Sequence, residues 1–390
     1  MRSHLKVAWE AKTLGDVCRL VSGQHIEAKD YNTESRGIGY LTGPSDFGLV
    51  YPVVSKWTEH PKVNAIRGDI LITVKGSGVG KINLLDQEEV AISRQLMAVR
   101  VTEADPSFVY AFLSSTFDHF QAQSTGAAIP GISRDQVLGL EIAVPPLPEQ
   151  RRIVGILDEA FEGIATAEAN AEKNLQNARA LFESHLQSVF TERGEGWEER
   201  PLAELCEVKD GTHDSPKYVA DGVPFVTQKN IRREGLSLED TKFITQLDHD
   251  DFYRRSNVAY GDILISMIGA NRGMACIVDD KRVFSIKNVG LVKQNGSINQ
   301  DFLLYFLKSQ AAIDYVSSRS KGGAQEFIGL TELRKFPIRT TSLQRQAVIV
   351  AKLDVLSSET ARLASIYQQK LAALDELKKS LLHQAFSGQL

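Results

Sequence analysis

The sequence predicts an α/β fold with an internal pseudo-twofold repeat: two mixed α+β globular domains separated by a coiled-coil-like rod of two long antiparallel helices. Three observations predict this fold class. The 390-residue chain carries the same sequence blocks twice, in the same order. Each copy opens with short β-rich runs, and each closes with a long segment that has an apolar seam.

The repeat is visible in two stretches that begin at tryptophans and align without a gap. From Trp9 the chain reads WEAKTLGDVCRLVSGQH, and from Trp197 it reads WEERPLAELCEVKDGTH, at an offset of 188. The segment GDILI then recurs at 68–72 and 261–265, an offset of 193, and later blocks recur at 194 and 196. A slow drift of this kind indicates two homologous halves whose surface loops differ by small insertions.

The first part of each half predicts a compact mixed domain, over residues 1–147 and 196–343. Runs such as DILITV, MAVRV and DILISMI are rich in strand-forming residues, and glycine and proline separate them. Short helical segments such as FVYAFLSS lie between the runs. We therefore expect strands and short helices to alternate in both ranges.

The remaining parts, residues 148–195 and 344–390, predict a central long helix with its linker and a C-terminal long helix. Pro148 suits a first helical turn, and Gly194 and Gly388 suit helix ends. Helices of about 43 residues would be roughly 65 Å long. Their apolar seams must be buried, and the sister helix is the simplest partner, although an unrelated bundle is the alternative.

Heptad spacing selects the residues of this helix–helix and partner interface. Glu168, His185 and Lys370 interrupt the apolar seam. The selected residues are Leu157, Phe161, Ile164, Leu175 and Phe182 in the first helix and Leu353, Leu356, Leu363, Tyr367, Leu374 and Leu381 in the second.

Composition excludes several classes of protein. No apolar run approaches the roughly 20 residues that span a bilayer, and the N-terminus lacks a signal-peptide core, so we expect a cytoplasmic protein. Three widely spaced cysteines fit neither a disulfide framework nor a zinc site. The formal net charge is -4, so the basic character typical of nucleic-acid-binding proteins is missing.

The glycine-rich stretch GSGVGK at 76–81 resembles a phosphate-binding loop but fails the test of spacing. Only three residues separate Gly76 from Gly80, and Ile82 stands where a magnesium-binding hydroxyl would be needed. The second copy reads GANRGM, without the middle glycine or the lysine. We therefore predict a strand–turn–strand hairpin. Hydrolase, metalloprotease and methyltransferase motifs are also missing, so we predict no catalytic residue and no metal site.

Taken together, these blocks resemble the specificity subunit (HsdS) of type I restriction–modification systems. The resemblance covers essentially the whole chain. It rests on the paired W-E-x(3)-L-x(3)-C openings, on GDILI before a glycine hairpin, on PPLPEQRRIV at 145–154 and on LKKSLLHQAFSGQL at 377–390. The second copy departs from it by replacing PPLPEQRRIV with TTSLQRQAVIV.

The resemblance implies a non-catalytic DNA-recognition subunit. Each globular domain would be a target recognition domain that reads one half of a bipartite, asymmetric target in double-stranded DNA. The helices would set the spacing and dock two methylation (HsdM) subunits, which flip and methylate an adenine with S-adenosylmethionine. Restriction (HsdR) subunits would add ATP- and Mg-dependent cleavage, so the subunit itself needs no cofactor. The alternatives are an orphan DNA-reading protein and a coiled-coil scaffold without a DNA role.

Charge by region qualifies this expectation. The four ranges 1–147, 148–195, 196–343 and 344–390 carry formal net charges of -2, -4, 0 and +2. Because counterion release supplies much of DNA affinity, we expect the isolated chain to bind DNA weakly and the methylation subunits to supply much of the clamp.

Polar residues at variable loops are the candidates for reading bases, because their side chains can donate to or accept from base edges. Each could instead be an ordinary solvated loop residue, and for the two aligned histidines, His25 and His213, a loop or structural role is the preferred interpretation. The candidates are Gln24, His25, Lys75, Ser77, Arg94 and Gln95, with Ser124 and Thr125, in the first domain, and Thr212, His213, Lys217, Gln228, Lys229, Asn230, Arg232, Arg233, Asn271, Arg272, Arg319, Ser320 and Lys321 in the second.

Overall fold

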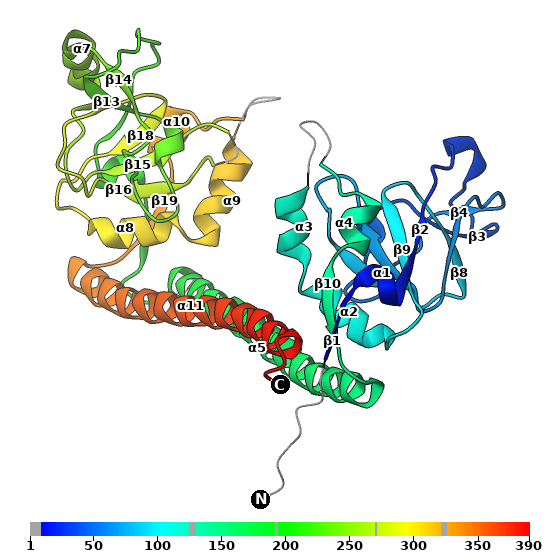
Figure 1. Cartoon of the computed structure of the whole chain (residues 1–390). Coiled ribbons are helices and arrows are strands. Elements are labelled where there is room, and N and C mark those ends of the chain that lie inside the picture. Colours follow the sequence, from blue (N-terminus) through cyan, green and yellow to red (C-terminus); the bar gives the residue numbers. More distant parts are fainter. Residues whose placement is uncertain (1–8, 125–129, 192–193, 270, 321–325) are drawn as a thin grey trace, which may run out of the picture. The chain divides into compact units, whose positions relative to one another are not determined.

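The computed structural model describes residues 9–124, 130–191, 194–269, 271–320 and 326–390, and Figure 1 shows their course. The chain divides into two compact units. Unit 1 comprises Met1–Ala171 and Gln369–Leu390, and unit 2 comprises Glu172–Gln368. Each unit therefore combines one globular domain with parts of both long helices.

Unit 1 is built on two four-stranded sheets and a strand pair. The first sheet is antiparallel, in the order β2 (Cys18–Ser22), β9 (Leu96–Val101), β6 (Ile70–Thr73), β7 (Ile82–Leu84). The second has the order β4 (Trp57–Thr58), β3 (Ile38–Leu41), β8 (Glu89–Ile92), β5 (Asn64–Ile66), and β1 (Glu10–Thr13) pairs with β10 (Glu141–Val144). The short helices are α1 (Leu14–Val17), α2 (Pro106–Ser114), α3 (Phe117–Gln123) and α4 (Arg134–Leu138), with 3₁₀ turns η1 (Ala28–Asp30) and η2 (Pro44–Asp46).

Unit 2 repeats this plan with one addition. Its main sheet has the order β12 (Val208–Asp210), β18 (Val289–Val292), β15 (Ile263–Ser266), β16 (Ala275–Ile277). The smaller sheet is β14 (Lys242–Ile244), β13 (Val223–Val226), β17 (Ser285–Ile286), and β11 (Glu198–Pro201) pairs with β19 (Pro337–Thr340). The shorter helices are α6 (Leu202–Leu205), α7 (Gln246–Ser256), α8 (Gln300–Leu307), α9 (Gln310–Arg319) and α10 (Leu330–Arg334), with the 3₁₀ turn η3 (Gln228–Asn230). The addition is α7, because residues 42–69 of unit 1, all described, contain no α-helix.

The ILI part of the repeated GDILI segment lies in an inner strand of each main sheet, and both faces of that strand are covered. In β6, Ile70 and Ile72 pack into the core beneath α2, while Leu71 packs into a second core shared with β3 and β8. In β15, Ile263 and Ile265 likewise pack into one core and Leu264 into another. Burial on both faces explains why this segment is a continuous apolar run rather than an alternating one.

The two long helices are α5 (Leu147–Thr191) and α11 (Leu343–Phe386), each beginning one residue before the predicted start. In unit 1 the first turns of α5, with Ile153 and Leu157, share a core with Ala385 near the end of α11. In unit 2 the last turns of α5 share a core with Val350 and Leu353 near the start of α11. The start of one helix thus meets the end of the other, and the pair is antiparallel, as predicted (Figure 1).

The aromatic packing at the helix ends also repeats. Phe190 at the end of α5 lies 5.3 Å, centroid to centroid, from Phe302 and from Phe306 in unit 2. Phe386 at the end of α11 meets Phe108 and Phe112 in unit 1, at 5.2 and 5.4 Å. Each long helix therefore ends in an edge-to-face aromatic cluster on α8 or α2, which are aligned helices of the repeat.

Candidate nucleic-acid interface

In unit 1, the predicted base-reading residues gather at one end of the main sheet. Because the sheet is antiparallel, the chain leaves β2 and β6 and enters β9 and β7 at the same end. Gln24 and His25 follow β2, Arg94 and Gln95 precede β9, and the hairpin between β6 and β7 carries further candidates. The candidates gathered there are Gln24, His25, Lys75, Ser77, Arg94 and Gln95, all of them exposed.

Backbone hydrogen bonds hold these loops together. Gly23 N donates to Leu96 O at 3.1 Å, Gln24 N donates to Ile92 O at 3.0 Å, and Val74 N donates to Gln95 O at 2.8 Å. A Cβ atom on Gly23 would lie 2.1 Å from the carbonyl oxygen of Ser93, so only glycine fits this approach. Three separate loops thus form one polar rim.

The same rim exists in unit 2 with different side chains. Gly211 N donates to Val289 O and Thr212 N donates to Ile286 O, and a Cβ on Gly211 would lie 2.2 Å from Ile286 O. Lys287 and Asn288 therefore lie beside Thr212 and His213. We did not predict these two residues, although they align with Arg94 and Gln95 at the repeat offset of 193 and that alignment could have identified them.

The smaller sheet brings a second group of candidates to this rim. Gln228 and Lys229 lie on η3. The Gln228 Nε2 atom is 3.7 Å from the point where a Cβ atom on Gly269 of the hairpin would lie. Asn230 of the same turn is buried, and its side chain accepts from Thr227 N and donates to Ser237 O. It holds the loop together from inside.

Several other candidates are engaged in contacts within unit 2. Arg232 pairs with Asp240 and Arg233 with Glu183 at the surface. Thr212 is buried, and its hydroxyl bonds to the Asp214 side chain and backbone.

Three further candidates of unit 2 are exposed. Arg319 is exposed at the end of α9, Asn271 on the hairpin between β15 and β16, and Lys217 in the loop after β12. Lys321 and Thr125 lie outside the described residues.

Arg272 on the hairpin between β15 and β16 joins two loops. Its Nε donates to Ser320 Oγ at 2.8 Å, its Nη1 donates to Gly269 O at 3.1 Å, and its guanidinium contacts the Glu326 carboxylate. Only 19% of the side chain is exposed. A DNA contact by Arg272 stays a prediction, and these contacts favour a structural role for it.

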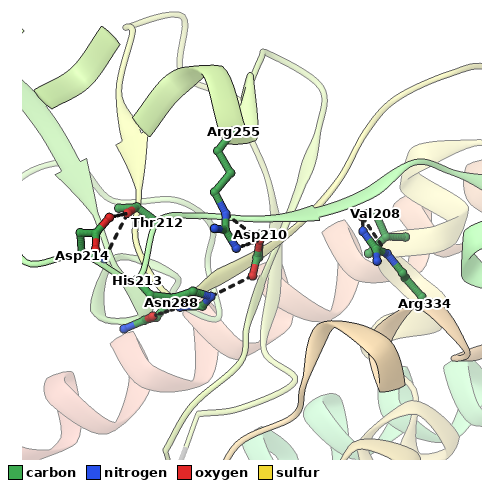
Figure 2. Close-up of polar contacts among 8 residues, drawn as sticks. All are labelled: Val208, Asp210, Thr212, His213, Asp214, Arg255, Asn288 and Arg334. Atoms are coloured by element: carbon green, nitrogen blue, oxygen red, sulfur yellow. Dashed lines mark hydrogen bonds and ion pairs between the residues drawn. The ribbon is translucent and has the colours of Figure 1, made fainter. Parts of the chain in front are cut away.

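A polar cluster at the end of β12 contains residues that sequence reasoning missed (Figure 2). Asp210, 6% exposed, accepts from Arg255 of α7 at Oδ1, from Nε at 3.0 Å and from Nη2 at 2.7 Å. Its Oδ2 lies 3.1 Å from Nε2 of His213, whose Nδ1 is 2.7 Å from Asn288 Oδ1. Asp210 has no repeat signature, because Ser22 stands at the aligned position in unit 1.

The glycine-rich stretch is the hairpin that the sequence predicts. Gly76 and Gly80 adopt φ of +93° and +84°, and the aligned Gly269 and Gly273 adopt +76° and +84°. Strands β6 and β7 pair directly on either side of it. The two glycines four residues apart are therefore needed for the backbone of the turn.

The described residues carry neither a reactive cysteine nor a cluster of metal ligands. The three cysteines are free and buried, and burial raises the pKa of Cys18 and Cys276 to about 12 and that of Cys206 to about 11, which makes them unreactive. Within the described ranges, no cluster of His, Cys, Asp and Glu could hold a metal ion. Among the described helices, none has the length and apolar character needed to cross a membrane.

The predicted seam residues lie on the packed faces of the long helices. Leu157, Ile164 and Leu353 are buried, and Phe161, Leu175, Phe182, Leu356, Leu363, Tyr367, Leu374 and Leu381 are half-buried. Glu168, an interruption of the seam, pairs with Lys378 at 3.3 Å in unit 1. Beyond Phe182 the buried residues of α5 are Leu186 and Phe190. Leu186 lies one position after His185, because a helix of 3.6 residues per turn drifts from a strict heptad.

The part of α11 in unit 2 also carries exposed apolar residues. Val348, Val355 and Ile366 are 53%, 66% and 43% exposed. Their spacings of 7 and 11 residues place them on one face of the helix, roughly opposite the buried Leu353 and Thr360. This group is called the α11 stripe below.

Comparisons with known proteins agree with this architecture. The family model described as "Type I restriction modification DNA specificity domain" matches residues 6–176 and again 194–371. The chain is 22% identical to the type I restriction enzyme MjaVIII specificity subunit of Methanocaldococcus jannaschii, across 98% of this chain and 93% of that one. It is 20% identical to the EcoBI specificity subunit of Escherichia coli, across 98% and 86%.

Two solved structures share the fold. A chain from a structure of complex assembly and conformational transition in the type I R-M system is 20% identical, with a TM-score of 0.80 and 98% of each chain covered. The HsdS subunit from Thermoanaerobacter tengcongensis is 19% identical, with a TM-score of 0.61 over 98% of this chain and 97% of that one.

Proposed function

The chain belongs to the family of type I restriction modification DNA specificity domains, and we propose that it is the non-catalytic specificity subunit of a type I restriction–modification complex. Each unit reads one half of a bipartite, asymmetric DNA target. The long helices set the distance between the half-sites and dock methylation subunits. S-adenosylmethionine, ATP and Mg belong to the partner subunits in this proposal.

The observation that carries this proposal is the contrast between framework and rim in the two units. Buried framework residues recur: Leu14 and Cys18 align with Leu202 and Cys206 in the two cores. The rim residues differ, with Gln24, Arg94 and Gln95 in one unit and Thr212, Lys287 and Asn288 in the other. Because base edges are read by polar side chains of matching hydrogen-bond pattern, one scaffold with two different rims suits two different half-sites.

Mapping methylated adenines tests the proposal. A complex of this chain with its methylation subunits should methylate adenines in a single motif with two unlike half-sites and a constant gap. Replacing the chain by a specificity subunit with other rims should change the motif. Methylation that is independent of the chain, or a motif without a gap, would contradict the proposal.

The α11 stripe supports the docking part of the proposal. Val348, Val355 and Ile366 leave apolar surface open on the face of the helix that the rest of unit 2 does not cover. A double substitution, V355E with I366E, should abolish co-purification with the methylation subunit while circular dichroism and thermal unfolding stay unchanged. Leu247→Glu is the matched control, because Leu247 is an apolar residue that is 81% exposed on α7. Retention of the partner by the double variant would contradict docking at this stripe.

A further inference from the structure

We propose that Arg255 reads a guanine in the half-site recognised by unit 2, and that Asp210 is the positioning residue that orients it. The inference rests on the proposed function, because it assumes that the rim of unit 2 faces DNA. It adds a residue that lies outside the loops that the repeat identifies.

Asp210 holds the guanidinium of Arg255 in one orientation. Asp210 is buried, and its Oδ1 accepts from both Nε and Nη2 of Arg255. The other oxygen of the same carboxylate is held by His213, whose ring is in turn held by Asn288, a residue with φ of +53°. The carboxylate therefore cannot rotate freely, and the plane of the guanidinium is set before any ligand arrives.

Arg255 keeps hydrogen-bond donors that Asp210 does not use. An arginine side chain has about five N–H donors, of which Asp210 takes two, so about three remain on Nη1 and Nη2. Half of the side chain, 50%, is exposed. The remaining donors form the outer fork of the guanidinium, on the side away from Asp210. A fork of this shape matches the O6 and N7 acceptors of guanine in the major groove.

The carboxylate of Asp210 favours a base over a phosphate as the partner of Arg255. A phosphate contact depends mainly on positive charge, and a neighbouring carboxylate weakens it by offsetting the charge of the guanidinium and repelling the phosphate. A bidentate contact with a base edge needs a fixed plane, which the carboxylate supplies. The buried Asp210 is thus a disadvantage for phosphate binding and an advantage for reading a base.

Arg255 lies beside the rim of unit 2. Helix α7 packs against β12 and β17, so Arg255 projects beside the loops of His213 and Asn288 at the rim (Figure 2). Unit 1 has Ser22 in place of Asp210 and, within the described residues, no α-helix in place of α7. This reading element is therefore specific to unit 2, and it contributes to the difference between the two half-sites.

The test uses the complex with its methylation subunits and a set of duplexes in which each base pair of both half-sites is varied. Arg255→Ala should reduce discrimination at one G·C pair of the unit 2 half-site about tenfold or more, with all other positions unchanged. Arg254→Ala is the matched control. Arg254 belongs to the same turn and charge class, but its side chain is 77% exposed and pairs with Asp251 on its own helix. Its removal should leave every preference unchanged.

Two further variants separate positioning from folding. Arg255→Lys keeps the charge and the helix but loses the planar fork. It should reduce discrimination at the same base pair as Arg255→Ala. Asp210→Asn should reduce discrimination at that base pair by less than Arg255→Ala does, and it should not weaken binding to non-specific DNA. Thermal unfolding of each complex identifies a variant that has lost its fold.

The outcomes that overturn the inference are distinct. Unchanged preferences with Arg255→Ala remove Arg255 from the DNA interface. A uniform loss across all sequences, with a smaller dependence on salt, makes it a phosphate contact. If the unsubstituted complex shows no base preference at either half-site, the proposed function itself fails, and with it the premise of this inference.

Discussion

The buried carboxylate of Asp69 is clamped by Arg100, with Nε 2.9 Å from Oδ1 and Nη2 2.8 Å from Oδ2. Asp69 also accepts from Ile66 N and so closes the turn before the central strand β6. In unit 2 the aligned Asp262 accepts from Ala259 N and meets Lys293, with Nζ 2.5 Å from Oδ2. The aspartate of the repeated GDILI segment is therefore structural in both units.

Removing this carboxylate should destabilise the chain. Asp69→Ala leaves Arg100 and a backbone N–H without their partner, and we expect a loss of about 2–4 kcal/mol in the free energy of unfolding. Arg100→Lys should cost far less, because Lys293 fills the aligned position in unit 2. Denaturant unfolding measures both. Arg67→Ala is the control, since its ion pair with Glu88 is exposed and should contribute under about 1 kcal/mol. Equal losses for Asp69→Ala and Arg67→Ala would contradict the structural role.

Two buried glutamines should anchor the long helices to the globular domains. Gln150 Oε1 accepts from Asp105 N at 2.7 Å and its Nε2 donates to Pro145 O, while Gln346 bonds to Asn299 N and Thr341 O in the same way. Substitution of either by alanine leaves a partly buried backbone N–H without its partner and should cost about 1–3 kcal/mol in the free energy of unfolding. Gln344→Ala, at an exposed position, is the control. A Gln346→Ala protein as stable as the control would remove this anchor.

The glycines before the aligned histidines should tolerate no side chain. Gly23→Ala and Gly211→Ala place a Cβ within about 2 Å of a carbonyl oxygen, so the loops of the rim must separate. We expect each variant to lose methylation of the bipartite target. Gly163→Ala in α5 is the control, because its Cβ meets nothing within 4 Å, and it should stabilise the helix by about 0.5–1 kcal/mol. Normal methylation by both rim variants would show that the close approach is dispensable.

Shortening the rod should shorten the gap in the target. Deleting seven residues from each long helix removes about 10 Å of helix, or about three base pairs of spacing, while it preserves the apolar seam. Methylation of duplexes with graded gaps measures the change. A control deletion of seven residues from only one helix breaks the pairing and should abolish methylation at every gap. An unchanged gap in the target of the double-deletion variant would contradict the proposal that the long helices set the distance between the half-sites.

The charge balance predicts weak DNA binding by the isolated chain. Its net charge is -4, and its globular ranges are neutral or acidic, so few phosphates can be neutralised. Titration of labelled target DNA should show much tighter binding once the methylation subunits are added, at the same salt concentration. Tight and strongly salt-dependent binding by the chain alone would contradict this.

The sequence by itself determined the duplication, the mixture of strands and short helices in each half, and the two long helices to within a residue of their starts. These features are local or periodic: heptads, proline and glycine signals, and blocks that recur at a nearly constant offset. It also predicted the glycine hairpin, because the second copy retained only the two glycines that the turn requires. The burial of Leu186 was not predicted, because a strict seven-residue spacing selects position 185 and ignores the helical period of 3.6 residues.

Only the tertiary structure decided which polar residues lie together. Sheet pairing brings Gln24, Arg94 and the β6–β7 hairpin to one rim, although some 70 residues separate the first two along the chain. The packing of the elements also brings Arg255 into contact with Asp210, 45 residues away along the chain, and Arg272 into contact with Ser320. Such contacts depend on the packing of non-adjacent segments, which has no period and leaves no pattern within a single sequence.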